Sequence, residues 1–382
     1  MANYSQNVYF ELIGFVGVPE KYNLVLSFMM FTVYSTAFIA NGTVIVLILV
    51  SRHLHQPMYI FIANLAFSDL LFDTVTLPKF IAKYWFGAGS MSFSQCFLQL
   101  FFVHCLGSLD SFILVLMAGD RYVAICNPLR YSSIITHTVT IASCSLSWLL
   151  AVISALATPV LIGQLPFPGQ TKIFSCFCSS SALLRSAIGD VTQVRQTLLI
   201  VALCVLLIPL VVILLSYVII IITIHCSSVS SNWQKMFYTC TTHLLVLNIY
   251  YIPRVFVYIA NFAKLILQPD INVLILCIYS YLPHIANPII YCLRTVEIKN
   301  TIIEQLNHHL MPPFHKSLCN TCFVAANSFN PSLEKEEFSV SESVSSLPFQ
   351  REGCVSASRP LSSLLGLQTL PEKVLHGCLS PA

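Results

Sequence analysis

Seven long apolar runs, separated by short polar stretches, dominate the pattern of hydrophobic and polar positions along the chain. A helix needs about 20 mostly apolar residues to cross the hydrocarbon layer of a membrane, and every run reaches that length. Because backbone N–H and C=O groups in lipid must pair within their own segment, we predict that each run forms a helix. The fourth and fifth runs are longer than one span and must also include some loop. The runs are Asn23–Val50, Met58–Pro78, Phe97–Gly119, Thr138–Thr171, Gln196–Ile224, Met236–Ala263 and Ile271–Leu293.

Charged residues are rare in these runs. The second run contains Asp69 and Asp73, the third contains Asp110, the sixth contains Arg254, and the others contain none. The whole chain is 56% hydrophobic and 9% charged, against about 25% charged in a soluble globular protein. We therefore predict an all-α membrane protein, a bundle of seven transmembrane helices.

The two ends of the chain differ from this apolar region. The first run begins at Asn23, so we predict a short N-terminal segment, residues 1–23, and one membrane domain, residues 24–294. Residues 295–307 combine charges with aliphatic side chains at helical spacing, which indicates a short amphipathic helix on the membrane surface. Residues 308–382 contain many Pro, Ser and Glu. We expect a disordered tail there, either a phosphorylated regulatory segment or an extension without a role.

The third run ends in a recognisable motif. Asp120-Arg121-Tyr122 lies within Met117–Cys126, and the match continues through a proline, a leucine and a tyrosine. The motif resembles the pattern M-A-Y-D-R-Y-V-A-I-C-x-P-L-x-Y of the odorant receptors, a family of rhodopsin-like G protein-coupled receptors, and departs from it only at Gly119. Four further motifs are similar to the family's, in the same order: Leu54–Tyr59, Ser216-Tyr217, Lys235–Leu244 and Pro283–Tyr291.

The resemblance implies a switch at the inner face that admits a heterotrimeric G protein. Arg121 is expected to pair with Asp120 and with polar groups of the sixth helix, and so to hold the bundle closed until it is released. Without its motif, the same arginine would be read as a long side chain reaching water from a helix end. The residues assigned to this switch are Asp120, Arg121, Tyr122, Tyr217, His243, Asn287, Pro288 and Tyr291.

The buried acids need a compensating charge. An ionised carboxylate at the centre of a membrane helix costs about 2.5–3.5 kcal/mol on insertion scales. The resemblance implies a sodium site formed by Asp69 and Asp110, with Asn41 and Asn287 nearby, since oxygen ligands suit a hard cation. The alternative is that one aspartic acid is protonated and shares a hydrogen bond with the other.

Arg254 bears on the chemistry of a ligand. It follows Tyr251 by one helical turn in the outer half of the sixth run, and a guanidinium in the central cavity would bind a carboxylate or phosphate with two hydrogen bonds. In the alternative, Arg254 is paired internally or reaches outward to lipid headgroups. The residues expected around this cavity are His104, Gly107, Ser108, Tyr251, Arg254 and Tyr258.

The outer side is identified by two features. Asn3 begins an acceptor triplet for glycosylation ahead of the first helix. In the family resembled, a disulfide ties the loop before the fifth helix to the top of the third, which implies a Cys96–Cys178 bond; Cys176 is a competing partner. Lys and Arg are spread too evenly between the two sides to decide the orientation in the membrane. The orientation is therefore inferred mainly from the family resemblance.

The sequence thus predicts a plasma-membrane odorant receptor with an extracellular N-terminus and a cytoplasmic tail. It would bind a small-molecule odorant, anionic and water-soluble if Arg254 is the anchor, and activate a stimulatory, olfactory-type G protein that raises cyclic AMP. We expect no enzymatic activity, no nucleic-acid partner and no cofactor beyond the candidate Na⁺. The alternatives are a secondary transporter, although inverted repeats are not apparent, and a membrane enzyme using Asp69, Asp110 and His243.

Overall fold

The computed structural model describes residues 8–226, 233–262, 268–294 and 298–303, which belong to one compact unit, Met1–Ile303. Asn3 and the tail at residues 308–382 lie outside the described residues. Within the surface helix expected at residues 295–307, the described residues 298–303 are helical. His53 Nε2 lies 2.8 Å from Thr301 Oγ1 and links this segment to the loop after the first helix.

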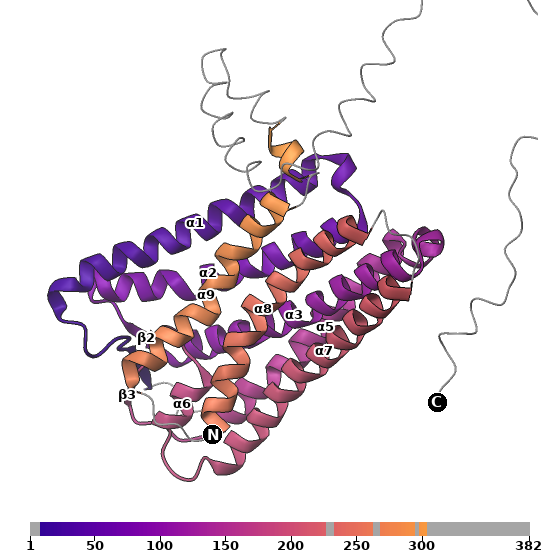
Figure 1. Ribbon diagram of the computed structural model, residues 1–382. Helices are drawn as coiled ribbons and strands as arrows, with labels where there is room; N and C mark the ends of the chain where they lie inside the picture. The colour runs from indigo at the N-terminus through magenta and orange to yellow at the C-terminus, as the bar shows by residue number, and fades with distance from the viewer. Residues whose placement is uncertain (1–7, 227–232, 263–267, 295–297, 304–382) are drawn as a thin grey trace, which may run out of the picture. The chain divides into compact units, whose positions relative to one another are not determined.

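Seven long helices of the described chain run side by side (Figure 1). Six of them are long and apolar enough to cross a membrane, and the apolar part of α8, His243–Val257, is shorter. The seven predicted runs therefore correspond one to one with long helices. These are α1 (Asn23–Val50), α2 (Pro57–Phe86), α3 (Phe93–Cys126), α5 (His137–Ile162), α7 (Thr192–Cys226), α8 (Trp233–Phe262) and α9 (Pro269–Arg294).

Local sequence sets where several helices begin and end. Ser92 caps α3 in a capping box with Gln95, so two otherwise unpaired backbone N–H groups are satisfied. Pro57 stands in the first turn of α2, where its missing N–H is harmless. The same helix ends at Gly87, whose φ of 70° is the left-handed conformation that glycine favours. Because α3 continues to Cys126, the Asp120-Arg121-Tyr122 motif lies inside the helix.

A small sheet at one end of the bundle was not predicted. Strand β1 (Tyr9–Leu12) lies between β2 (Ser90–Ser92), which is antiparallel to it, and β3 (Gln170–Ile173), which is parallel. Phe10 is fully buried, and its ring lies 5.3 Å from that of Phe167. Strands β2 and β3 lie at the same end of the molecule as the short helix α6 (Ser180–Ser186) (Figure 1). Part of the N-terminal segment is therefore folded onto the loops.

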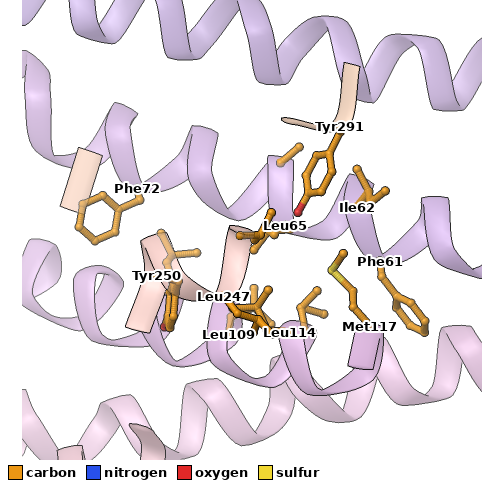
Figure 2. Packing of buried hydrophobic residues seen from close by; sticks show 14 of the residues in the cluster. Phe61, Ile62, Leu65, Phe72, Leu109, Leu114, Met117, Leu247, Tyr250 and Tyr291 are labelled. Atoms are coloured by element: carbon orange, nitrogen blue, oxygen red, sulfur yellow. The ribbon is translucent and has the colours of Figure 1, made fainter. Parts of the chain in front are cut away.

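The bundle has an apolar outer surface and an apolar core. Large aliphatic side chains such as Ile39, Leu149 and Ile208 are exposed, as expected where the surrounding solvent is lipid. Inside, side chains from α2, α3, α8 and α9 form one cluster, and Figure 2 shows Leu65 and Tyr291 within it. The remaining short helices are η2 (Glu20–Tyr22), η3 (Arg52–Leu54), η4 (Pro128–Arg130) and α4 (Tyr131–Ile134).

Candidate functional site

A cavity of about 590 Å³ lies between the helices on the side of α6. This volume is within the range of small-molecule binding sites. Four residues expected from the sequence line it: His104, Gly107, Ser108 and Arg254. The side chain of Tyr258 lies outside the described residues.

The prediction that Tyr251 lines the cavity was wrong. Tyr250, the preceding residue, lines it instead. The hydroxyl of Tyr251 lies 2.9 Å from Ser111 Oγ on α3 and is buried against that helix. Successive helical residues point about 100° apart, and here Tyr250 points into the cavity while Tyr251 points toward α3. Tyr251 joins α8 to α3 beneath the cavity wall.

Arg254 is buried, with 9% of its surface exposed. Its Nη1 donates to the Tyr250 carbonyl oxygen at 3.2 Å, and the guanidinium carbon lies 3.7 Å from the centre of the Tyr250 ring. The Tyr279 ring is 5.6 Å away. Among the described residues no acidic side chain forms an ion pair with Arg254. The cation is therefore held by aromatic faces inside the protein.

The cavity wall combines apolar side chains with further cationic and polar groups. Arg185 from α6 and Arg195 from the first turn of α7 line it and are exposed. His104 Nε2 is buried and has no hydrogen-bond partner among the described residues. None of the described residues that line it is an aspartate or glutamate. The sequence did not indicate Arg185 or Arg195 as cavity residues, because a loop helix and a helix end bring them there.

The buried acids form a cluster around a histidine. His284 Nδ1 lies 2.7 Å from Asp73 Oδ1, and its Nε2 lies 3.4 Å from Asp69 Oδ1. Ligand atoms of Asp69, Asp110 and His284 all lie within 4.8 Å of one another. The sequence reading missed His284, although it stands one turn before Asn287 and so shares its helix face.

The two asparagines of the predicted sodium site use their amide nitrogens within the protein. Asn287 Nδ2 donates to Asp69 Oδ2 at 3.2 Å, and Asn41 Nδ2 donates to the carbonyl oxygen of His284 at 2.8 Å. The Oδ1 atoms of both asparagines are buried without a hydrogen-bond partner in the described chain. Asp110 accepts from Ser68 Oγ at 2.6 Å. Carboxylate oxygens and unpaired amide oxygens fit a hard cation such as Na⁺.

At the C-terminal end of α3, far from the disulfide end, two residues of the Asp120-Arg121-Tyr122 motif form an ion pair. Arg121 Nη2 lies 3.2 Å from Asp120 Oδ2, and the hydroxyl of Tyr131 donates to Asp120 Oδ1 at 2.7 Å. Burial, together with the hydrogen bond to Asp120, raises the pKa of Tyr131, so this phenol remains a donor. Asp120 is thus shared by Arg121 and Tyr131, and Tyr122 packs against the core nearby.

The other predicted switch residues lie where helices meet. Tyr217 Oη on α7 is 2.6 Å from His243 Nδ1 on α8, which links the two helices. Pro288 lies inside α9. Tyr291, one turn later, is buried, and its hydroxyl has no hydrogen-bond partner among the described residues. Figure 2 shows its ring beside Ile62 and Leu65 of α2.

The structure contains the Cys96–Cys178 disulfide, and Cys176 is a free, buried thiol. The bond ties the loop before α7 to the first turn of α3. The backbone N–H of Cys178 also donates to Gln99 Oε1 at 2.8 Å. The bond joins the two cysteines that were expected to pair, and Cys176 takes no part in it.

Loss of this bond should destabilise the outer end of the bundle. Cys96→Ser or Cys178→Ser is expected to lower the free energy of unfolding by about 2–4 kcal/mol, because the cross-link restricts the unfolded chain. The double variant should lose little more than either single variant. Unfolding of the purified protein checks this, with Cys176→Ser as the control. A larger defect in Cys176→Ser than in Cys178→Ser would contradict the prediction.

Comparison with known proteins places this arrangement in a family. A family model described as "Olfactory receptor" matches residues 30–309. Olfactory receptor 1E1 of Homo sapiens is 35% identical over 293 residues, which is 77% of this chain and 92% of the relative. Olfactory receptor 1500 of Rattus norvegicus is 34% identical over 295 residues, which is 77% of this chain and 94% of the relative.

A solved structure has the same fold. The crystal structure of squid rhodopsin superimposes with a TM-score of 0.63 at 16% identity, covering 84% of this chain and 94% of that one. At this identity the likeness shows the fold, a rhodopsin-like bundle. The match to the family model and the similarity to whole relatives show that the chain belongs to the olfactory receptor family of G protein-coupled receptors, and that it is an odorant receptor rather than an enzyme.

Proposed function

We propose that this multi-pass odorant receptor responds to small anionic odorants and then activates a stimulatory, olfactory-type G protein, raising cyclic AMP. The anionic ligand class is inferred from the buried guanidinium of Arg254. This group lines the cavity and forms no ion pair with an acidic side chain in the described chain. Among the described residues, the cavity lining contains no carboxylate that would repel a bound anion. A carboxylate, sulfonate or phosphate is therefore the chemical group that this site fits best.

Burial of the Arg254 charge costs solvation free energy. A cation removed from water loses solvation, and the faces of Tyr250 and Tyr279 replace only part of it. An anionic odorant would supply the missing counter-charge through charge-assisted, two-pronged hydrogen bonds. Neutral odorants would leave the guanidinium as it is. The difference in binding free energy between the two ligand classes is thus largest at Arg254.

Ligand binding at this position would act on the contacts between α8 and α3. Arg254 lies one turn from Tyr250, whose hydroxyl donates to the Gly107 carbonyl oxygen of α3 at 2.6 Å. Tyr251 makes the second link, to Ser111. A ligand changes the conformational equilibrium only through its different affinity for the two states. We infer that an anion held by Arg254 favours the state in which these links rearrange and α8 moves at its inner end.

In the proposed orientation, the cavity opens toward the outside of the cell. A disulfide forms in an oxidising compartment, and the Cys96–Cys178 bond lies at the same end as the sheet formed by β1. The Asp120–Arg121 pair stands at the other end of α3. This supports a plasma-membrane location with an extracellular N-terminus and a cytoplasmic coupling face.

The proposal is tested by a screen of small water-soluble compounds divided into anionic, neutral and cationic sets. Cells that express the receptor should raise cyclic AMP in response to members of the anionic set, and cells without it should not. Surface abundance measured in parallel separates a silent receptor from one that is not delivered. A receptor activated only by neutral or cationic compounds would contradict the proposed ligand class.

We further propose that Asp69 and Asp110, with Asn41 and Asn287, hold Na⁺ preferentially in the inactive bundle. Raising the sodium concentration, with choline replacing it at constant ionic strength, should then lower agonist potency. Asp69→Asn should remove this dependence. Identical sodium titrations for the wild type and the variant would contradict the sodium site. Charge balance within the cluster, by a protonated carboxyl group or by His284, would then be favoured.

A further inference from the structure

Arg254 is not the only cation of its cavity. Arg185 and Arg195 line the same space, one from α6 and the other from the first turn of α7. Both side chains are exposed, whereas Arg254 is buried. The cavity therefore has positive charge at two levels, one enclosed and one at its mouth.

The two mouth arginines lie near each other. The partly enclosed position of Arg185 in the cavity wall, together with the charge of Arg195, lowers the pKa of Arg185. The Nε of Arg185 donates to the Ser181 carbonyl oxygen at 3.1 Å, which does not neutralise it. Within the part of the chain that the structure describes, no acid forms an ion pair with either arginine. Asp190 is close in sequence, but its carboxylate accepts from the backbone N–H of Thr192 at 2.9 Å.

The remaining cavity lining suits a short organic chain. Hydroxyl groups come from Ser108 on α3 and Ser180 on α6, and aliphatic side chains such as Leu198 and Val205 come from α7. A chain of methylene groups, with or without a hydroxyl, would contact both kinds of surface. A volume of about 590 Å³ accommodates such a molecule.

We propose that the preferred ligands are elongated dianions, which place one anionic group against Arg254 and the second between Arg185 and Arg195. This inference rests on the proposed anionic-ligand function and narrows it. The second anion would relieve the repulsion between the two mouth arginines. The alternative is that these arginines only attract anions from water, which would favour singly and doubly charged ligands in proportion to their charge.

The test compares straight-chain α,ω-dicarboxylates of increasing length with monocarboxylates of the same length, read by cyclic AMP. Diacid potency is expected to peak at one length and to exceed that of the matched monoacid by about tenfold, which corresponds to about 1.4 kcal/mol. The double variant Arg185→Gln/Arg195→Gln should reduce this ratio to near one. Replacing both arginines with Lys should preserve much of it, since the charge remains.

Lys172→Gln is the matched control. Lys172 is an exposed cation of β3 at the same end of the molecule, and it is not among the cavity-lining residues. Its loss should leave the ratio of diacid to monoacid potency unchanged. A ratio that survives Arg185→Gln/Arg195→Gln while both potencies fall would assign these arginines to general attraction of anions and overturn the inference.

The wild-type series is decisive even if a variant fails to fold. Equal potency of diacid and monoacid at every length overturns the dianion inference. If monoacids still act and Arg254→Gln abolishes their action, the proposed response to anions stands even though the dianion inference fails. If no carboxylate of either kind acts, and sulfonates and phosphates of the same lengths do not act either, the proposed function itself fails.

Discussion

Arg121→Ala should abolish agonist-driven production of cyclic AMP while leaving ligand binding and folding largely intact. Arg121 pairs with Asp120 near the C-terminal end of α3. The last residue of this helix that lines the cavity is Ser111, well before Arg121 along the helix. Removal of the guanidinium breaks its ion pair with Asp120, the contact that we propose holds the inner face closed until a G protein binds. The measurement is cyclic AMP at matched surface expression, with binding of the same agonist measured separately.

Arg130→Ala provides the control for this prediction. Arg130 is an exposed arginine of η4, only a few residues further along the chain. The control removes the same charge from the same face of the membrane, and its signalling should stay near that of the wild type. Retained signalling in Arg121→Ala would contradict the assigned switch. Equal loss in both variants would point to a general charge effect instead.

The second large effect is expected at Arg254. Arg254→Gln should weaken the potency of an anionic agonist by more than tenfold, because a hydrogen bond to a charged group contributes about 1.5–3 kcal/mol. Arg254→Lys keeps the charge but loses the planar group that stacks on Tyr250 and holds a carboxylate at two points. The lysine variant should therefore retain part of the response. Concentration–response curves at measured surface abundance check the order of the three proteins.

A neutral agonist of the same receptor is the internal control for these variants. Its potency should change little in Arg254→Gln, because it gains little from the guanidinium. An anion response that survives Arg254→Gln unchanged would leave Arg254 as a structural residue. Loss of the neutral and anionic responses together would show that the variant disturbs the bundle.

The fold was largely predictable because the lipid environment imposes a simple rule on the sequence. Runs such as Asn23–Val50 must be helical, and the helix α1 has these bounds. The small sheet could not be predicted in the same way. Strand β1 pairs with Ser90–Ser92 and Gln170–Ile173, two segments far from it in sequence, and each strand is too short to show a clear alternation.

The site was predictable only in part, for a similar reason. Helical spacing indicated the face of α3 that carries His104 and Ser108, but it did not decide between Tyr250 and Tyr251 on α8. Arg185 belongs to a loop helix, and no periodicity places a loop residue in a cavity. His284 was overlooked because a histidine in an apolar run gives no sign of its partners until α2 and α9 pack together.

The most direct test of the account is guanine-nucleotide exchange on a purified stimulatory G protein, driven by the purified receptor in lipid. The account predicts that a small anionic compound accelerates exchange with the wild type and has little effect with Arg254→Gln at the same concentration. It would be contradicted if only neutral or cationic compounds accelerated exchange, or if the anion acted equally on both proteins.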